Sequence, residues 1–262
     1  MKVAFLQLPV DLGFGGPEWH HLYNVLATDR PNILVTNEMP FGPWVASGEA
    51  FDVSAAKLTS DVHELGLRAL MDLPVPIVFS SRPRLFNASL VNEAFALDHG
   101  RYVYLHQKQY FPQEPGFYEK TWFHSTQSGF ETTNIGGLNI GVLLCTELMF
   151  NEHARAYGRE GADIIVAPRS TGMSSSRWLT AGAMAAIVSG AYVVSSNRSG
   201  VDCSGQAFGG CGFAFNPLGE LIASTSSENP VLTFELDIGL SRFQKREYPC
   251  YVDEMAPNPH LL

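Results

Sequence analysis

The stretch IGVLLCTELMF, residues 140–150, sets an apolar run directly against a thiol and two polar side chains. Residues 140–144 are typical of a buried strand, because short apolar runs rich in branched side chains favour strands. Cys145 follows this run, and Thr146 and Glu147 come next. A free cysteine is often simply a small core residue. The alternative is a nucleophile at the tip of a strand, and the remainder of the chain decides between the two interpretations.

Similar apolar runs recur along the chain, separated by segments with helical spacing or turn residues. Strands are predicted at residues 3–8, 33–36, 77–80, 89–92, 101–105, 140–144, 164–167, 192–196, 212–215 and 231–235. Helices are predicted at residues 18–29, 54–70, 152–160 and 178–189. Strand–helix alternation followed by hairpins, one of them turning at NPLGE, predicts an α/β fold with a mixed sheet or two sheets packed face to face. Without repeats or a linker, we expect a single domain over residues 1–262.

The bulk composition excludes several classes of protein. The chain has 262 residues, a net charge of −9 and 16% charged residues. It has no cluster of Lys and Arg, which argues against nucleic-acid binding, and no run approaches the roughly 18 apolar residues of a membrane span. The four cysteines lack the spacing of a zinc site, so no metal is expected. The opening MKVAFLQLPVDLGFGG lacks a signal peptide's long apolar core, so we expect a cytoplasmic protein.

Three predicted strands end in side chains with complementary chemistry. Glu38 follows one strand in NILVTNEMPFG, Lys108 follows another in RYVYLHQKQYFP, and Cys145 follows the third. Taken singly, such a glutamate is as often a turn residue and such a lysine is usually solvated. Ligands meet many α/β proteins at the carboxyl ends of strands. A carboxylate, an ammonium and a thiol at the same relative place therefore predict one catalytic site.

This combination suits nucleophilic catalysis on an acyl carbon. A carboxylate can accept the thiol proton during attack, and an ammonium stabilises both the thiolate and the oxyanion that forms next. The backbone N–H of Thr146 is a second candidate oxyanion donor. The rival interpretation is a Cys–His pair that uses His106, His124 or His153, none of which lies in a recognisable local signature.

The three segments resemble the nitrilase, or carbon–nitrogen hydrolase, superfamily, whose members use a Glu–Lys–Cys triad in strand-end motifs of this kind and in this chain order. The triad maps onto Glu38 in TNEMPFG, Lys108 in HQKQYFP and Cys145 in LLCTELMFNE. The run after the cysteine departs from the family's pattern at Thr146 and Asn151. Segments similar to KVAFLQLPV, GADIIVAP and VVSSNRSG extend the resemblance over almost the whole length.

The resemblance implies a four-layer αββα sandwich, in which two mixed sheets carry helices on both outer faces. It implies hydrolysis of a non-peptide carbon–nitrogen bond in an amide or N-carbamoyl group, through a thioester on Cys145 and without a cofactor. A nitrilase acting on a nitrile and an inactive binding protein are the alternatives. Members of the superfamily assemble, so we expect a homodimer or a higher homo-oligomer, with residues 239–262 as a contact tail.

Further site residues are predicted around the triad. In KQYFPQEPGFYEKTWF, Glu119 resembles an additional glutamate of the N-carbamoyl-amine hydrolases, and we assign it to hold Lys108, with Glu114 as the competitor. Arg169 is expected to bind a substrate carboxylate or else to pair with a neighbouring acid. The residues expected to bind substrate, although such aromatics equally suit a core, are Phe41, Trp44, Tyr118, Trp122, Arg169, Ser170 and Trp178.

Overall fold

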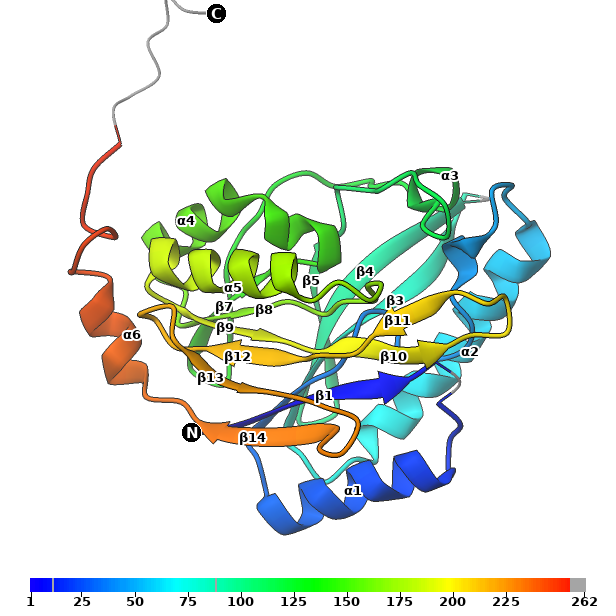
Figure 1. Ribbon diagram of the computed structural model, residues 1–262, viewed down its shortest axis with the longest axis horizontal. Coiled ribbons are helices and arrows are strands. Elements are labelled where there is room, and N and C mark those ends of the chain that lie inside the picture. The colour runs from blue at the N-terminus through cyan, green and yellow to red at the C-terminus, as the bar shows by residue number, and fades with distance from the viewer. Residues whose placement is uncertain (11, 88, 255–262) are drawn as a thin grey trace, which may run out of the picture.

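The computed structural model describes residues 1–10, 12–87 and 89–254, which form two β-sheets packed face to face (Figure 1). The strands of the larger sheet are β1 (Lys2–Pro9), β2 (Ile33–Val35), β3 (Ile77–Phe86), β4 (Ser89–Asp98), β5 (Arg101–Gln107), β10 (Asn197–Val201), β11 (Ala207–Gly209) and β14 (Val231–Glu235). Those of the smaller sheet are β6 (Thr133–Ile135), β7 (Leu138–Val142), β8 (Ile164–Val166), β9 (Tyr192–Ser195), β12 (Phe213–Phe215) and β13 (Leu221–Ser224).

Both sheets are mixed. The larger sheet has the order β11-β10-β1-β2-β3-β4-β5, with β14 also paired to β1, and the smaller has the order β13-β12-β9-β8-β7-β6. β1, β2 and β3 run parallel, as do β7, β8 and β9, whereas β3, β4 and β5 run antiparallel. The parallel strands within each sheet therefore deliver the residues that follow them to one edge of that sheet.

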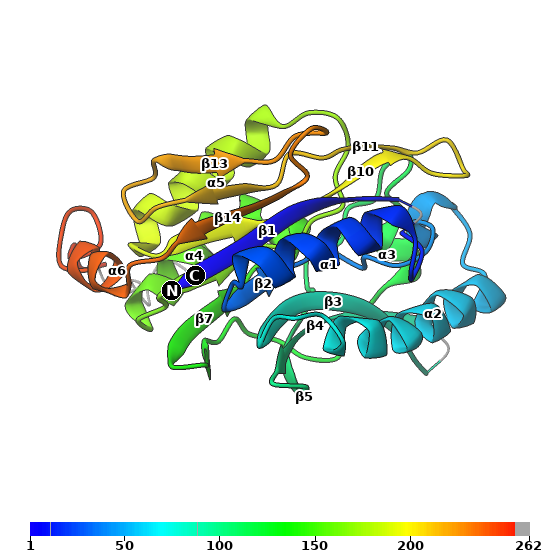
Figure 2. The ribbon, with the colours of Figure 1, turned by 90° about the horizontal axis from the view of Figure 1, so that it is seen from below.

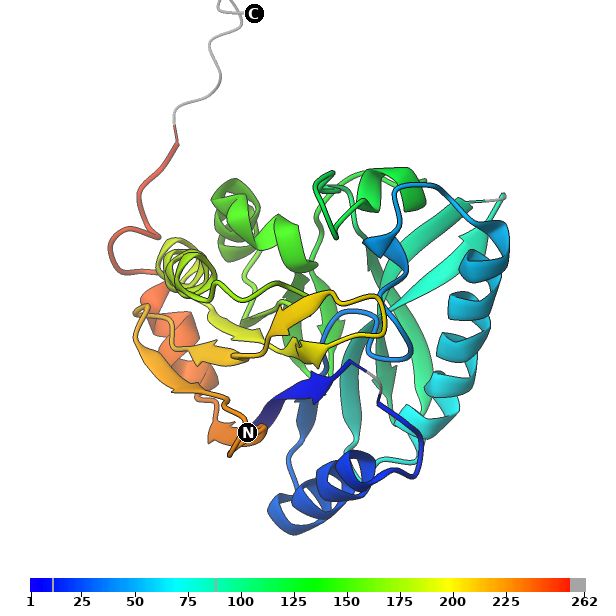
Figure 3. The ribbon, with the colours of Figure 1, turned by 45° about the vertical axis from the view of Figure 1, so that its right-hand side comes forward.

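Helices cover both outer faces of this pair of sheets. The helices are α1 (Pro17–Asp29), α2 (Val53–Met71), α3 (Glu119–Trp122), α4 (Asn151–Arg159), α5 (Ser176–Ser189) and α6 (Ile238–Gln244), with short 3-10 turns η1 (Val45–Ser47) and η2 (Cys145–Met149). One apolar cluster joins the facing sides of the two sheets, a second joins the larger sheet to α1 and α2, and a third joins the smaller sheet to α4 and α5. Figures 2 and 3 show α1 and α2 on one side and α4 and α5 on the other. The expected four-layer αββα sandwich is confirmed.

The packing of α2 fixes the segment that follows β2. The carboxylate of Asp52 caps the helix by accepting hydrogen bonds from its first turn. A Cβ atom at Gly66 would lie 2.3 Å from the ring of Phe41, so only glycine lets the two segments approach this closely. One turn earlier, Nε2 of His63 accepts a hydrogen bond from the Phe41 N–H at 3.2 Å. These contacts hold the chain just beyond Glu38 against the outer helix.

Every predicted strand and helix has a counterpart in the structure, but several bounds differ. β3 continues to Phe86, beyond the predicted end at residue 80, although Arg82 and Arg84 lie within the extension. Both arginines pair with Glu93 on β4, at 3.1 and 3.2 Å, so their charges are compensated across the sheet. β6, β10 and β11 were not predicted, because these short polar or glycine-containing strands lack an apolar run.

The last described residues lie along α4. Arg155 and Arg159 of this helix both pair with Glu254. Of the predicted contact tail, residues 239–254 are described, and residues 255–262 lie outside the described part of the chain. Homo-oligomer formation through this tail stays a prediction, as does the assignment of a single domain. Within the described ranges, each helix is too short or too polar to cross a lipid bilayer.

Candidate active site

Glu38 lies three residues beyond the end of β2, and its side chain is fully buried. Its Oε1 accepts hydrogen bonds from Nδ2 of Asn92 at 2.7 Å and from Nζ of Lys108 at 2.9 Å. Its Oε2 is buried too, and it has no hydrogen-bond partner among the described residues. A buried carboxylate oxygen is costly to leave unpaired. One oxygen is thus anchored while the other stays free to accept a proton.

Lys108 follows β5 by one residue, and its ammonium is completely buried between two carboxylates. Nζ lies 2.9 Å from Glu38 and 2.5 Å from Glu119. Burial disfavours the charged lysine, but Glu119 and Glu38 outweigh this effect and hold the pKa of Lys108 well above its ordinary value. The group is therefore a permanent cation at the centre of the site.

Glu119 begins α3 and is also buried. Burial raises its carboxyl pKa to about 7, although the ammonium of Lys108 opposes that shift. Glu114, the competitor for the same role, has its side chain exposed at the rim of the neighbouring pocket. It is therefore Glu119 that contacts Lys108.

Cys145 opens the turn η2 three residues after β7, in a left-handed conformation with a φ of 51°. Such a backbone costs a non-glycine residue about 1–3 kcal/mol and is found at sites that must present a side chain in one direction. Its N–H is held by the carbonyl oxygen of Pro168 at 3.0 Å. Burial raises the pKa of the thiol far above its ordinary value, the charge of Glu38 raises it further, and Lys108 acts in the opposite direction. The resting sulfur is therefore protonated.

Glu147 connects the nucleophile turn to the strand that carries the lysine. Its buried carboxylate accepts hydrogen bonds from the Leu144 N–H at 2.8 Å, from the Gln109 N–H at 2.7 Å and from Nε2 of His106 at 2.9 Å. His106 is thus engaged by Glu147, which lies in the turn η2 that follows β7 of the smaller sheet, and it does not line the pocket beside Cys145. The carboxylate fixes the distance between the ends of β5 and β7.

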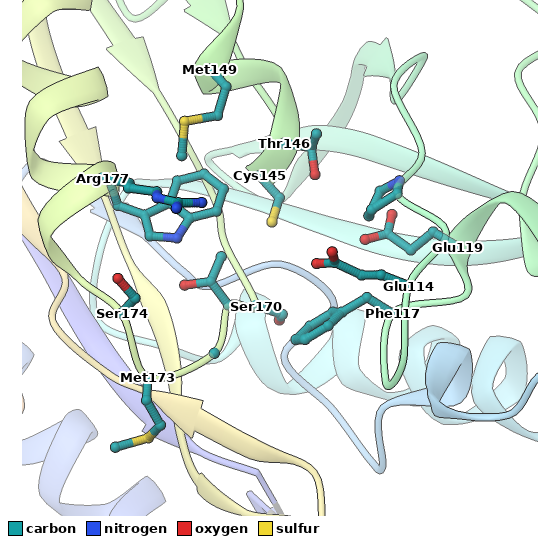
Figure 4. A pocket seen from close by; sticks show the side chains of 14 residues that line it. Glu114, Phe117, Glu119, Cys145, Thr146, Met149, Ser170, Met173, Ser174 and Arg177 are labelled. Atoms are coloured by element: carbon teal, nitrogen blue, oxygen red, sulfur yellow. The ribbon is translucent and has the colours of Figure 1, made fainter.

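A pocket of about 370 Å³ opens beside Cys145 (Figure 4). Its lining residues are Pro112, Glu114, Phe117, Glu119, Cys145, Thr146, Met149, Ser170, Thr171, Gly172, Met173, Ser174, Arg177 and Trp178. Figure 4 shows Glu114, Phe117 and Glu119 on one side of the sulfur and Arg177 on the other. The N–H of Thr146 belongs to the first turn of η2, where backbone N–H groups have no partner within the helix. The thiol of Cys145, the carboxylate of Glu119 and the backbone of Thr146, which carries the candidate oxyanion donor, therefore lie on one surface.

Of the predicted substrate-binding residues, Ser170 and Trp178 line this pocket. Phe41 and Trp44 do not, and each is only 2% exposed within an apolar cluster. Trp122 is also absent from the lining, since its ring packs on Phe51. These aromatics lie in apolar clusters outside the pocket beside Cys145.

Tyr118 and Arg169 complete this correction. The hydroxyl of Tyr118 donates to the carboxylate of Glu49 at 2.6 Å, away from the pocket lining. Arg169 is 1% exposed and donates hydrogen bonds to two hydroxyls and a carbonyl, so it neither reaches into the pocket nor pairs with an acid among the described residues. Neither expectation for Arg169 describes its environment.

Two further residues of the site were not predicted. Asn92 ends a predicted strand and donates to Glu38, while its carbonyl oxygen accepts the Lys108 N–H at 2.9 Å. The structure places Asn92 inside β4, which continues to Asp98, so the strand-end signal that pointed to the triad does not apply to it. Phe117 in the pocket lining had no such signal. Within the described ranges, no group of three or more His, Cys, Asp and Glu side chains is placed to hold a metal ion.

Comparison with known protein families gives one clear match. The sequence model described as "Carbon-nitrogen hydrolase" matches residues 56–246, well over half of the chain. The N-carbamoylputrescine amidase of Solanum tuberosum is 26% identical over 197 residues, which are 69% of this chain and 64% of that enzyme. The match thus spans just under two thirds of the relative's own length.

Solved structures share the fold. The carbon–nitrogen hydrolase from Helicobacter pylori G27 superposes with a TM-score of 0.83 at 22% identity, over 95% of this chain and 94% of that chain. An amidase from Nesterenkonia sp. superposes with a TM-score of 0.73 at 18% identity, over 92% of both chains. At these identities the likeness establishes the fold alone.

Proposed function

This chain belongs to the carbon–nitrogen hydrolase family, and we propose that it hydrolyses the amide or N-carbamoyl group of a small molecule through a thioester on Cys145. The observation that carries this proposal is the free Oε2 of Glu38, buried in a centre whose other oxygen is already bound by Asn92 and Lys108. A buried, unpaired carboxylate oxygen is the group that a protonated thiol requires as its base.

In the first half-reaction the sulfur of Cys145 attacks the carbonyl carbon while its proton passes to Oε2 of Glu38. The oxygen of the tetrahedral intermediate becomes negative, and Nζ of Lys108 and the N–H of Thr146 stabilise it. The carbon–nitrogen bond then breaks, and Glu38 returns the proton to the leaving nitrogen. Ammonia or an amine departs, and the acyl group stays on the sulfur.

In the second half-reaction a water molecule gives a proton to Glu38 and attacks the thioester carbon. The carbon–sulfur bond breaks, Glu38 protonates the sulfur, and the acid product leaves. Each proton that Glu38 accepts is returned, so the cycle is balanced. Because burial raises the pKa of the Cys145 thiol, the mechanism has Glu38 accept its proton as the sulfur attacks.

The pocket and the relatives together support the proposed substrate class. A volume of about 370 Å³ suits a small molecule. The curated relative acts, by its name, on N-carbamoylputrescine. Small amides and ureides are therefore the leading candidates, ahead of nitriles.

Ammonia release from a panel of small amides, N-carbamoyl amines and nitriles tests this proposal, with the Cys145→Ala variant as the matched control. We expect turnover of amides or ureides by the wild-type protein and none by the variant. Turnover of nitriles alone would replace the proposal with nitrilase activity. No turnover of any substrate, together with a sulfur that resists iodoacetamide, would indicate a binding protein instead.

A further inference from the structure

Arg169 carries a buried charge that the proposed mechanism does not use. Its side chain is 1% exposed, and its guanidinium donates to Oγ of Ser195 at 2.6 Å, to Oγ1 of Thr171 at 3.2 Å and to the carbonyl oxygen of Cys211 at 2.7 Å. All three acceptors are neutral. In the part of the chain that the structure describes, Arg169 forms no ion pair, which is unusual because buried charges are normally paired.

The guanidinium lies directly behind the wall of the catalytic pocket. Its central carbon is 5.2 Å from the centre of the Trp178 ring and 4.6 Å from that of Phe213. Trp178 and Thr171 both line the pocket beside Cys145. Arg169 therefore supports two lining residues from the side that faces away from the substrate.

The backbone around Arg169 borders the reacting groups themselves. The carbonyl oxygen of Pro168 accepts the Cys145 N–H at 3.0 Å, and that of Arg169 accepts the Glu38 N–H at 3.1 Å. The hydroxyl of Ser170 donates to the carbonyl oxygen of Glu38 at 2.8 Å. The positive charge thus belongs to the segment that holds both the nucleophile and its base.

With Glu119 ionised, the three buried groups that contact one another at the centre carry a net negative charge. Glu38 and Glu119 are two buried carboxylates, and the ammonium of Lys108 between them supplies one positive charge. When Glu38 takes the thiol proton, the negative charge moves to the sulfur and then to the substrate oxygen, so the surplus persists throughout the reaction. A surplus buried charge of one sign is stabilised by an unpaired charge of the other sign nearby.

We propose that Arg169 is a positioning residue that, from behind the pocket wall, balances the surplus negative charge of the catalytic centre and so favours the anionic sulfur and oxyanion. Its role in turnover rests on the proposed hydrolysis, but its effect on Cys145 is measurable without a substrate. Burial lowers the pKa of Arg169 to about 10, while Cys145, Cys211 and Glu38 favour its charged form. The other ionisable groups around the centre include Lys108, Glu119 and Glu147. They also include Arg198, whose guanidinium donates to Oγ of Ser170 at 3.4 Å, and Glu114 and Arg177, which line the pocket.

The test is the rate at which iodoacetamide alkylates Cys145 as a function of pH, followed by intact-protein mass spectrometry. The variants are Arg169→Gln, which removes the charge, and Arg169→Lys, which keeps it. The matched control is Arg82→Gln, which removes a half-buried arginine that pairs with Glu93 on the far side of the larger sheet. Thermal unfolding of every variant identifies any that do not fold.

We expect Arg169→Gln to slow alkylation at neutral pH about tenfold, because loss of a nearby unit charge raises the apparent pKa of the thiol by about one unit. Arg169→Lys and Arg82→Gln should stay within about threefold of the wild type at that pH. A folded Arg169→Gln variant with an unchanged profile, or lysine and glutamine variants that are slowed equally, would overturn the proposal.

If Arg169→Gln fails to fold, the pH dependence of alkylation in Arg169→Lys still tests the proposal. A lysine ammonium loses its proton more readily than a guanidinium when buried. The alkylation rate of this variant relative to wild type should therefore fall as the pH rises from about 6 to about 9. A constant ratio over this range would mean that the residue only supports the wall. Because alkylation needs no substrate, a failure to hydrolyse any amide would count against the proposed function and leave this result intact.

Discussion

Replacing Lys108 with methionine removes the cation that contacts both buried carboxylates. Nζ lies 2.9 Å from Glu38 and 2.5 Å from Glu119, and all three side chains are at most 1% exposed. Removing one partner of a buried ion pair costs about 3–5 kcal/mol, because the remaining charge is left uncompensated. We expect the free energy of unfolding of Lys108→Met to fall by about that amount near neutral pH.

The loss of stability should depend on pH in a defined direction. Burial already raises the Glu119 pKa to about 7 while Lys108 is present, and without Lys108 we expect it to rise further. A carboxyl whose folded-state pKa lies above its unfolded value of about 4.3 binds its proton more tightly in the folded state. Its contribution is therefore fully present below the unfolded pKa and is lost as the pH rises through the folded pKa. The variant should recover stability below about pH 5.

Urea unfolding at several pH values measures the stability, and ammonia release measures turnover, which should fall by about a hundredfold or more because an oxyanion donor is lost. The matched control is the double variant Lys108→Met/Glu119→Gln. It removes the surplus carboxylate, so it should regain part of the lost stability but no activity. A single variant as stable as wild type at pH 7, or a double variant that regains turnover, would refute this account of the buried centre.

Substitutions of Glu119, Asn92, Trp178 and Trp44 test the roles of the other residues in and around this centre. Wild-type stability should decline as the pH rises from about 4.5 to about 7, because the Glu119 pKa is raised; a thermal midpoint series should lose this slope in Glu119→Gln. Asn92→Ala removes the 2.7 Å donor to Glu38 and should lower kcat about tenfold, as steady-state assays would reveal; an unchanged kcat would contradict this. Trp178→Ala should raise KM more than it lowers kcat. Trp44→Ala should instead cost about 3–5 kcal/mol of stability, measured in urea, with KM unchanged, because Trp44 lies outside the pocket.

The groups at strand ends were predictable because their signal is local. An apolar run that stops at Glu38, Lys108 or Cys145 identifies both a strand and the residue that it delivers to the sheet edge. β2 and β7, which precede Glu38 and Cys145, lie in parallel pairs, whereas β5, which precedes Lys108, pairs antiparallel with β4. The three strands come from two sheets that pack face to face. Contact between Lys108 and Glu119 followed from the resemblance, and the structure places the two side chains 2.5 Å apart.

The lining of the pocket was not predictable in the same way. Trp44 and Trp178 are both tryptophans in segments that follow parallel strands, β2 and β8, yet one is buried in an apolar cluster and the other lines the pocket beside Cys145. That difference depends on how α5 and the loops meet across the two sheets, which leaves no mark in the local sequence. The same is true of Glu147, whose partner His106 comes from the opposite sheet. The environment of Arg169, whose guanidinium donates to two hydroxyls and a carbonyl, also depends on contacts that only the folded chain defines.

The most direct measurement is a rapid-quench mass spectrum of the protein during turnover of an amide that it hydrolyses. The account predicts a transient mass increase equal to the acyl group, located on the peptide that contains Cys145 and absent from Cys145→Ala. Sustained turnover by Cys145→Ala, or an adduct on any other side chain, would contradict it.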